Sequence, residues 1–292
     1  MSIHAHGVPN WIDLHTGSVP EARDFYEALL GWSFRNRLTV LSSPPTDDVL
    51  AARGIGVGAA GISSSNPNPD GSMALALSAD GGPAAEIIER GKSFDEMALL
   101  SNWVPYVYVD DLHTTLELVE AAGGLVASSP ARRGDMATVA TIMDPSDALL
   151  CLWEPVQLSG AAMHHPGTLT WIELETPDLD AATKFYAELF GWDAGVVSMG
   201  EDFKGDTYTL FTKNGERVAG AVETAMLGLD ASWFPSFLVQ DVDEVAAVCG
   251  SNGGVLMAEP LDIPVGRQAV LVDPGGAAFS VLGPKSNRPR PL

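Results

Sequence analysis

The chain has 292 residues and a formal net charge of −22 at pH 7, because 38 acidic residues face only 16 lysines and arginines. A surface with that charge repels phosphate backbones and anionic lipid, so we expect no nucleic-acid partner and no membrane partner. The hydrophobic content of 46% is typical of a compact globular protein, and the length allows two domains. The sequence shows no leader-like or membrane-spanning stretch, and its two cysteines, Cys151 and Cys249, make no disulfide framework. We therefore expect a cytoplasmic protein with buried thiols.

An internal repeat runs through the chain. Residues 11–32 read WIDLHTGSVPEARDFYEALLGW and residues 171–192 read WIELETPDLDAATKFYAELFGW, 160 positions apart and without a gap. Residues 103–112 match residues 233–242 at a spacing of 130, and a Gly-Gly step follows each of them. Such self-similarity predicts a duplicated structural unit.

The repeat also sets the domain limits. An Asp-Pro turn closes each half, at Asp144 and at Asp273. We predict one domain over residues 8–156 and a second over residues 166–284, joined by a short linker.

Each half divides again by its pattern of apolar residues. In the first quarter, an apolar strand that starts at Trp11 leads to a helix with a capping-box spacing to Glu21 and a stop at Gly31. Short β-rich segments follow, and the second quarter repeats the same order. The expected helix caps are Ser18, Asp111, Asp178 and Asp241. We therefore predict an α+β fold in which four β-α-β-β-β units form two cupped, mixed β-sheet domains with helices outside.

One segment distinguishes the two halves. If Ala60-Gly61 corresponds to Ala219-Gly220, the first half has 29 extra residues before Trp103. This excess, about residues 63–101, comprises a polar loop and a helix-like piece over residues 84–100. A lid or dimer contact and a surface elaboration without a role both remain open. We predict that the excess shields one cup, so that only one cup binds a ligand tightly.

The landmarks of each half resemble the vicinal-oxygen-chelate superfamily, which includes glyoxalases, bleomycin-resistance proteins and extradiol dioxygenases. They are the Phe-Tyr helix that ends in Leu-x-Gly-Trp, Val-x-Asp at residues 109–111, the Gly-Gly step, and the Asp-Pro-x-Gly turn at residues 273–276. The initial tryptophan and the tandem arrangement resemble actinobacterial glyoxalase-like proteins. The resemblance covers nearly the whole chain and implies the cupped glyoxalase-like fold.

The resemblance also implies a metal position in each cup, formed by three strands. The residues that fall there are Trp11, about Val104, and Cys151 in the first half, and Trp171, about Phe234, and Ser280 in the second. Among them Cys151 alone is a good ligand, and one soft thiolate does not hold a hard or borderline divalent ion. We expect no metal and no other cofactor in either cup.

Strand alternation predicts which side chains line the cups instead. If the first tryptophan of each strand points inward, then so do the acidic and histidine side chains two and four residues later. The candidates for acid–base chemistry are Asp13, His15, Glu173 and Glu175, and the candidates for ligand contact are Trp11, Trp103, Tyr106, Tyr108, Trp171 and Trp233. Plain core packing is the other reading of the tryptophans. Buried carboxylates are costly unless they are paired or wet, which favours a cleft.

Two functions of different classes fit these residues. The first is a metal-free protein of the sequestration or resistance type that binds a small organic ligand, an aromatic or polyketide-like metabolite. The second is a metal-independent enzyme of secondary metabolism that uses the cup carboxylates as general acid or base. A monomer and a homodimer both remain open.

Overall fold

The computed structural model describes residues 5–37, 73–89, 101–199 and 207–285. The first half contains β1 (Pro9–Thr16), α1 (Val19–Leu30), β2 (Ser33–Arg37), β3 (Met73–Leu77), β4 (Pro83–Glu89), β5 (Asn102–Tyr108), α4 (Leu112–Ala121), β6 (Leu125–Val126), β7 (Ala131–Arg133), β8 (Ala137–Met143) and β9 (Leu149–Pro155). The second half contains β10 (Leu169–Thr176), α5 (Leu179–Phe190), β11 (Asp193–Ser198), β12 (Thr207–Lys213), β13 (Glu216–Glu223), β14 (Ser232–Leu238), α6 (Val242–Cys249), β15 (Val255–Ile263), β16 (Gly266–Val272) and β17 (Ala278–Gly283).

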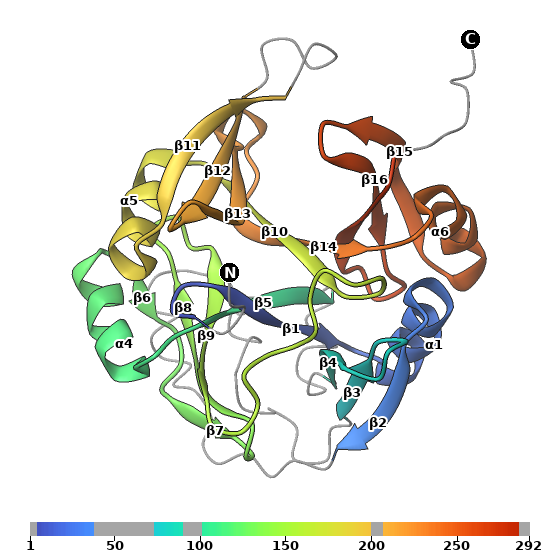
Figure 1. The fold of residues 1–292 in the computed structure, drawn as a ribbon, viewed down its shortest axis with the longest axis horizontal. Coiled ribbons are helices and arrows are strands. Elements are labelled where there is room, and N and C mark those ends of the chain that lie inside the picture. The colour runs from blue at the N-terminus through green and yellow to red at the C-terminus, as the bar shows by residue number, and fades with distance from the viewer. Residues whose placement is uncertain (1–4, 38–72, 90–100, 200–206, 286–292) are drawn as a thin grey trace.

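Each half forms one mixed β-sheet, as predicted. The strand order is β2-β3-β4-β1-β5-β9-β8-β6 in the first sheet, where β7 also pairs with β8, and β11-β12-β13-β10-β14-β17-β16-β15 in the second. The first strands of the two units in a half, β1 and β5 or β10 and β14, pair antiparallel at the centre of the sheet. The fold is therefore the α+β arrangement of four β-α-β-β-β units in two curved sheets (Figure 1).

The helices begin where the sequence predicts. The side chain of Ser18 accepts a hydrogen bond from the amide of Glu21, and Gly31 ends α1 with a φ of 68°, in the left-handed region that favours glycine. Asp111, Asp178 and Asp241 each accept a bond from the amide three residues later. Within the described residues, no helix is long and apolar enough to cross a membrane.

The difference between the halves lies elsewhere than expected. Residues 83–89 form β4, so the helix-like interpretation of the segment from Ala84 is wrong over that stretch. β4 pairs with β1 as β13 pairs with β10, which aligns Glu86, not Gly61, with Gly220. Most of the excess therefore falls between β2 and β3, which 35 residues separate, whereas 8 residues separate β11 from β12. Those 35 residues and residues 90–100 lie outside the described part, and the predicted shielding role falls on them.

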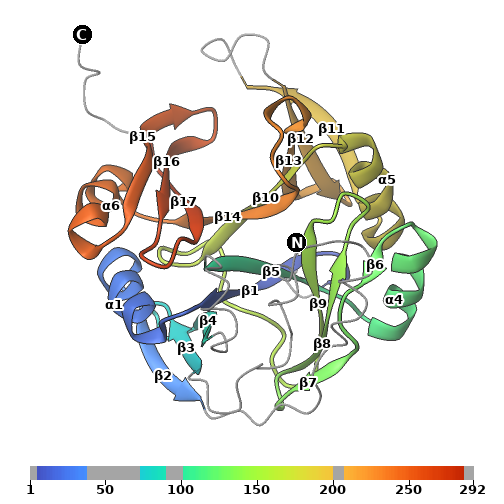
Figure 2. The same cartoon turned by 180° about the vertical axis from the view of Figure 1, so that it is seen from behind.

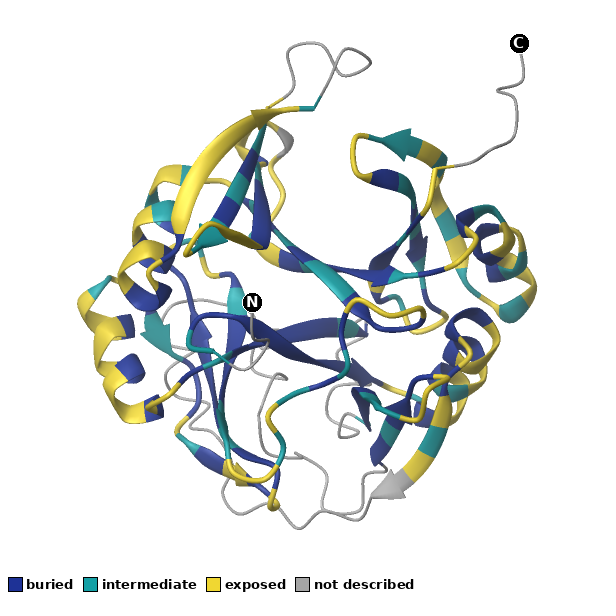
Figure 3. Ribbon diagram, viewed as in Figure 1, coloured by how far each residue is buried: buried dark blue, intermediate teal, exposed yellow. Residues whose placement is uncertain are grey.

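The two sheets pack back to back and their cups face away from each other. Figures 1 and 2 show α1 beside α6 at one side of the molecule and α4 beside α5 at the other. The central strand β1 is buried along its whole length, and its neighbour β5 is buried at all but its two end residues, as Figure 3 shows in dark blue. A single apolar core spans both halves, because α1, α5 and the inner faces of both sheets all contribute side chains to it.

The repeated Phe-Tyr and Gly-Trp motifs build this shared core. Tyr26 on α1 donates a hydrogen bond to Asp273 of the other half at 3.1 Å and accepts one from Trp103 at 3.1 Å. Tyr186 on α5 does the same with Asp144 at 3.1 Å and Trp233 at 3.2 Å. The residues that define the repeat thus bind one domain to the other.

Candidate functional site

The first cup is filled by its own side chains. Arg133 from β7 donates to Asp13 at 2.6 Å and to the hydroxyl of Tyr106 at 2.8 Å, through the same nitrogen. Its other nitrogens donate to Glu86 at 3.0 and 2.5 Å. All four side chains are at most 1% exposed. A guanidinium ion therefore occupies the place where a ligand of this cup would bind.

Aromatic rings enclose the ion. The guanidinium carbon of Arg133 lies 5.4 Å from the ring centre of Tyr106 and 6.0 Å from that of Trp153. Trp11 stacks on Trp153 at 5.0 Å, and its ring nitrogen donates to Asp13 at 2.8 Å. Burial raises the pKa of Cys151 in the same cup to about 12, so this thiol is protonated at neutral pH and is not a ready nucleophile.

The second cup is hollow. A cavity of about 420 Å³ opens between its strands. Its apolar and aromatic walls include Trp171, Tyr208, Leu210, Val197, Met199, Ile263, Val265 and Leu282, and its polar lining includes Glu173, Ser236, Gln268 and Arg217. Few polar groups on a largely apolar wall are typical of pockets for small organic molecules.

A hydrogen-bonded chain lies along the wall of this cavity. The ring nitrogen of Trp171 donates to the hydroxyl of Tyr208 at 2.8 Å, and Tyr208 is in turn hydrogen-bonded to Glu173. Burial raises the pKa of Glu173; the bond from Tyr208 opposes this rise, and the nearby charge of Glu175 adds to it. On the opposite wall, Gln268 donates to Ser280 at 3.1 Å and Ser280 contacts Ser236 at 2.5 Å.

Strand register explains why one cup is full and the other hollow. Glu86 pairs with Asp13, whereas the equivalent partner of Glu173 is Gly220. Tyr106 pairs with Trp11, whereas Ser236 pairs with Trp171. In the same way, Ile263 of the second domain occupies the position equivalent to Arg133 of the first, and Leu282 occupies the position equivalent to Trp153. Four large or charged side chains are thus replaced by smaller or uncharged ones.

Gly220 has a further role in shaping the cavity. A Cβ atom at this position would lie 1.8 Å from the hydroxyl oxygen of Tyr208. Only glycine allows the tyrosine ring to cross β13 and reach Trp171. The missing side chain therefore both enlarges the cavity and positions its phenol.

The structure separates the predicted site residues into three groups. Trp171 and Glu173 line the cavity, and Glu175 lies half-buried beside it on β10. Trp11, Asp13, His15 and Tyr106 are buried in the first domain. Tyr108 is half-buried at the end of β5, where its backbone bonds to Gly7 and Val8.

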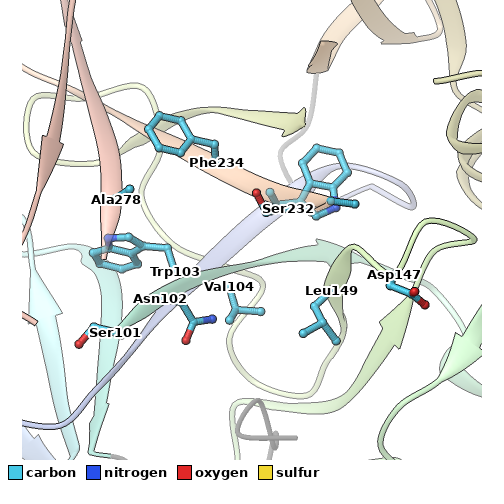
Figure 4. A pocket seen from close by; sticks show the side chains of 11 residues that line it. Ser101, Asn102, Trp103, Val104, Asp147, Leu149, Ser232, Phe234 and Ala278 are labelled. Carbon is cyan, nitrogen blue, oxygen red and sulfur yellow. The ribbon is translucent and has the colours of Figure 1, made fainter. Parts of the chain in front are cut away.

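Trp103 and Trp233, the other two candidates for ligand contact, line neither cup. Trp103 pairs with Leu14, and both side chains lie on the face of the sheet opposite to that of Asp13. The ring of Trp103 therefore faces the sheet of the second domain. Both tryptophans line a smaller cavity of about 220 Å³ between the domains, where Figure 4 shows Trp103, Val104 and Phe234. Their ring nitrogens donate hydrogen bonds to the hydroxyl groups of Tyr26 and Tyr186 in the shared core.

In neither cup do the residues at the family's metal position form a set of ligands suited to a metal ion. The residues that meet there are Trp11, Tyr106 and Cys151 in one cup, and Trp171, Ser236 and Ser280 in the other. The expected middle residues, Val104 and Phe234, pair instead with Asp13 and Glu173, two positions further along. Over the described residues, no group of three or more His, Cys, Asp or Glu side chains could hold a metal ion.

Sequence reasoning missed several residues that shape the cups. Glu86 is a lone carboxylate in an apolar strand, the same signal that identifies Asp13, but the sequence predicts a helix for its segment. Arg133 stands in a polar turn, where nothing in the sequence indicates that its side chain points inward. Tyr208 needs the empty space at Gly220, which only the pairing of β12 with β13 reveals.

Comparisons with known proteins agree with this architecture. The model of the Glyoxalase/Bleomycin resistance protein/Dioxygenase superfamily matches residues 8–152 and 168–281. The chain is 33% identical to the protein CFP32 of Mycobacterium tuberculosis, over 97% of each chain. It is 30% identical to the anthracycline biosynthesis protein DnrV of Streptomyces peucetius, over 97% of this chain and 95% of that protein.

Solved structures share the fold at low sequence identity. The Mn(II)-bound glyoxalase of Novosphingobium aromaticivorans has a TM-score of 0.60 at 13% identity, over 96% of this chain and 83% of that one. The 2,3-dioxygenase LapB of Pseudomonas sp. KL28 has a TM-score of 0.59 at 16% identity, over 100% and 98%. From its repeats, its two curved sheets and these matches, the chain belongs to the glyoxalase/bleomycin resistance protein/dioxygenase superfamily, as a tandem two-domain member.

Proposed function

We propose that this protein binds a small organic molecule in the cup of its second domain, without a metal ion, while the first domain serves as a structural partner. The observation that carries the proposal is the contrast between the two cups. The first is filled by the buried ion pairs of Arg133, and the second holds a cavity of about 420 Å³.

The lining of the cavity favours a flat, apolar ligand. Trp171 and Tyr208 offer aromatic surface, and Leu210 and Leu282 add apolar walls. The polar groups are few and separated, which suits a molecule with hydroxyl, carbonyl or amine groups at defined positions. A relative that is named for anthracycline biosynthesis supports an aromatic, polyketide-like metabolite as the ligand class.

The proposal is tested by filling the second cup with the residue that fills the first. A Ser236→Tyr variant places at β14 the tyrosine that stands at the equivalent place on β5. Native mass spectrometry of the protein purified from its own host should show a small-molecule adduct on the wild type and none on this variant. The matched control is Cys151→Ser, which puts the second cup's serine into the first cup and should leave the adduct in place. An adduct that survives in Ser236→Tyr, or is lost in Cys151→Ser, contradicts the proposal.

The alternative is a metal-independent enzyme that works in the same cavity. Of the four acid–base candidates, Glu173 lines the cavity, and its raised pKa and its bond to Tyr208 favour it as the general acid or base. Asp13 is held by Arg133 in the filled cup, which argues against it in that role. The enzyme would be favoured if the wild type chemically changes the captured molecule and Glu173→Gln still binds it but no longer changes it.

A further inference from the structure

The first cup contains a cation that the chain itself supplies. The guanidinium of Arg133 contacts the carboxylate of Asp13 and lies over the rings of Tyr106 and Trp153. A carboxylate with aromatic walls is a general recognition site for organic cations, because both the charge and the ring faces attract them. In the first domain, the side chain of Arg133 itself occupies this site.

The second cup has a carboxylate and a tryptophan at the equivalent positions but no arginine at the position of Arg133. Glu173 stands at the position of Asp13, and Trp171 at that of Trp11. Ile263 replaces Arg133 at the paired position on the neighbouring strand. The side chain of Glu173 is thus largely enclosed, beside a cavity, with its hydrogen bond from Tyr208 and no ion pair among the described residues.

We propose that the ligand of the second cup carries a positively charged nitrogen, an amine or guanidine, which binds Glu173 while an aromatic or apolar body lies against Trp171. This inference rests on the proposed function above and names the class of molecule. The ligand supplies to Glu173 the positive charge that Arg133 supplies to Asp13.

The other charged groups at the cavity agree with this assignment. Glu175 lies two residues along β10 from Glu173 and adds negative charge on the same side. Arg217 is exposed at the rim of β13, where solvent screens its charge. An anionic ligand that reached Trp171 would meet both glutamates in a site of low polarity, where repulsion between like charges is strong. Tyr208 donates to Glu173 and so supports its charged form.

The experiment compares three probes that share a naphthalene ring and differ in the charge of the attached group. Isothermal titration at neutral pH with naphthylmethylamine, naphthylmethanol and naphthoate measures the contribution of charge on one aromatic body. We expect the amine to bind about tenfold or more tightly than the alcohol, and naphthoate to bind weakest, because charge-assisted hydrogen bonds are about twice as strong as neutral ones. The affinity for the amine should fall at acidic pH, where Glu173 is protonated.

Two variants separate this inference from the proposed function. Glu173→Gln keeps the shape and a hydrogen bond, so the amine should bind within about threefold of the alcohol, with the affinity for the alcohol unchanged. Glu188→Gln, the same substitution at an exposed position of α5 outside the lining of this cavity, is the control and should leave the preference for the amine intact. The inference is overturned if naphthoate binds best, or if Glu173→Gln keeps the full preference.

The outcomes for the two proposals differ. Equal binding of all three probes, abolished by Ser236→Tyr, would sustain a binding function and refute the cationic ligand. Absence of binding by every probe would contradict both.

Discussion

Replacement of Arg133 by methionine tests whether the filled cup is a structural element. The side chain is 1% exposed and pairs with two carboxylates that are 0% exposed, at 2.6 Å to Asp13 and 2.5 Å to Glu86. Removing one partner of a buried ion pair leaves an uncompensated charge and costs about 3–5 kcal/mol. Two carboxylates lose their partner here, so we expect the free energy of unfolding to fall by at least about 3 kcal/mol.

Urea denaturation followed by tryptophan fluorescence measures this loss, and the chain offers a matched control. Arg267 also bridges two carboxylates, Asp243 at 2.8 Å and Asp262 at 3.0 Å, but its side chain is 18% exposed. Such a partly solvated pair contributes about 0–1 kcal/mol, so Arg267→Met should change little. Equal losses in the two variants would refute the reasoning.

A compensated variant separates the effect of charge from that of shape. Asp13→Asn and Glu86→Gln combined with Arg133→Met remove every charge of the cluster while nearly keeping its volume. Because neutral replacements of buried ion pairs are often tolerated, the triple variant should recover most of the stability that Arg133→Met loses. A triple variant no more stable than the single one would indicate that packing, not charge, sets the cost.

Three further predictions concern the second cup and the domain contact. Glu173→Gln should be more stable than the wild type at neutral pH, and the difference should close at acidic pH. Burial raises the pKa of Glu173, so its charge destabilises the folded state only above the pKa that this group has in the unfolded chain. Thermal melts across pH measure the difference in stability, and a difference that grows on acidification would contradict the prediction. Tyr26→Phe removes the bond to Asp273 and leaves the ring nitrogen of Trp103 unpaired, so unfolding free energy should drop by about 1–3 kcal/mol in chemical denaturation, and an unchanged midpoint would argue against the contact. Elemental analysis of the purified protein should find no stoichiometric Fe, Ni, Mn or Zn, since the metal positions that the family resemblance implies carry Trp, Tyr or Ser, and Cys or Ser. One tightly held metal per chain would contradict this prediction.

The sequence predicts the fold well because the repeat specifies it twice. The gap-free match of residues 11–32 with 171–192 gives the same strand, cap and helix in each half, and the structure has them at equivalent positions. The second-unit strands follow for the same reason. The alignment of the halves fails where the repeat is interrupted, between β2 and β4, and there the sequence predicts a helix for the segment of Glu86 that forms β4.

The site is harder to predict because it depends on contacts across strands. Alternation correctly places Asp13 and Trp11 on one face, but it does not reveal that Arg133 reaches them from a separate strand 120 residues away. The motif tryptophans Trp103 and Trp233 have the composition of a ligand wall, yet pairing with Leu14 and Leu174 turns them to the domain interface. Which face a strand residue uses is set by register, and register here is visible only in the assembled sheet.

The central claim is that the second cup binds the ligand and the first does not. A crystal structure of the protein with naphthylmethylamine tests it directly. We predict one probe per chain in the cavity of the second domain, with its ammonium nitrogen at hydrogen-bond distance from Glu173 and its rings against Trp171, and the Arg133 cluster unchanged. A probe bound in the first cup with Arg133 displaced, or in the cavity beside Trp103 between the domains, would contradict the account.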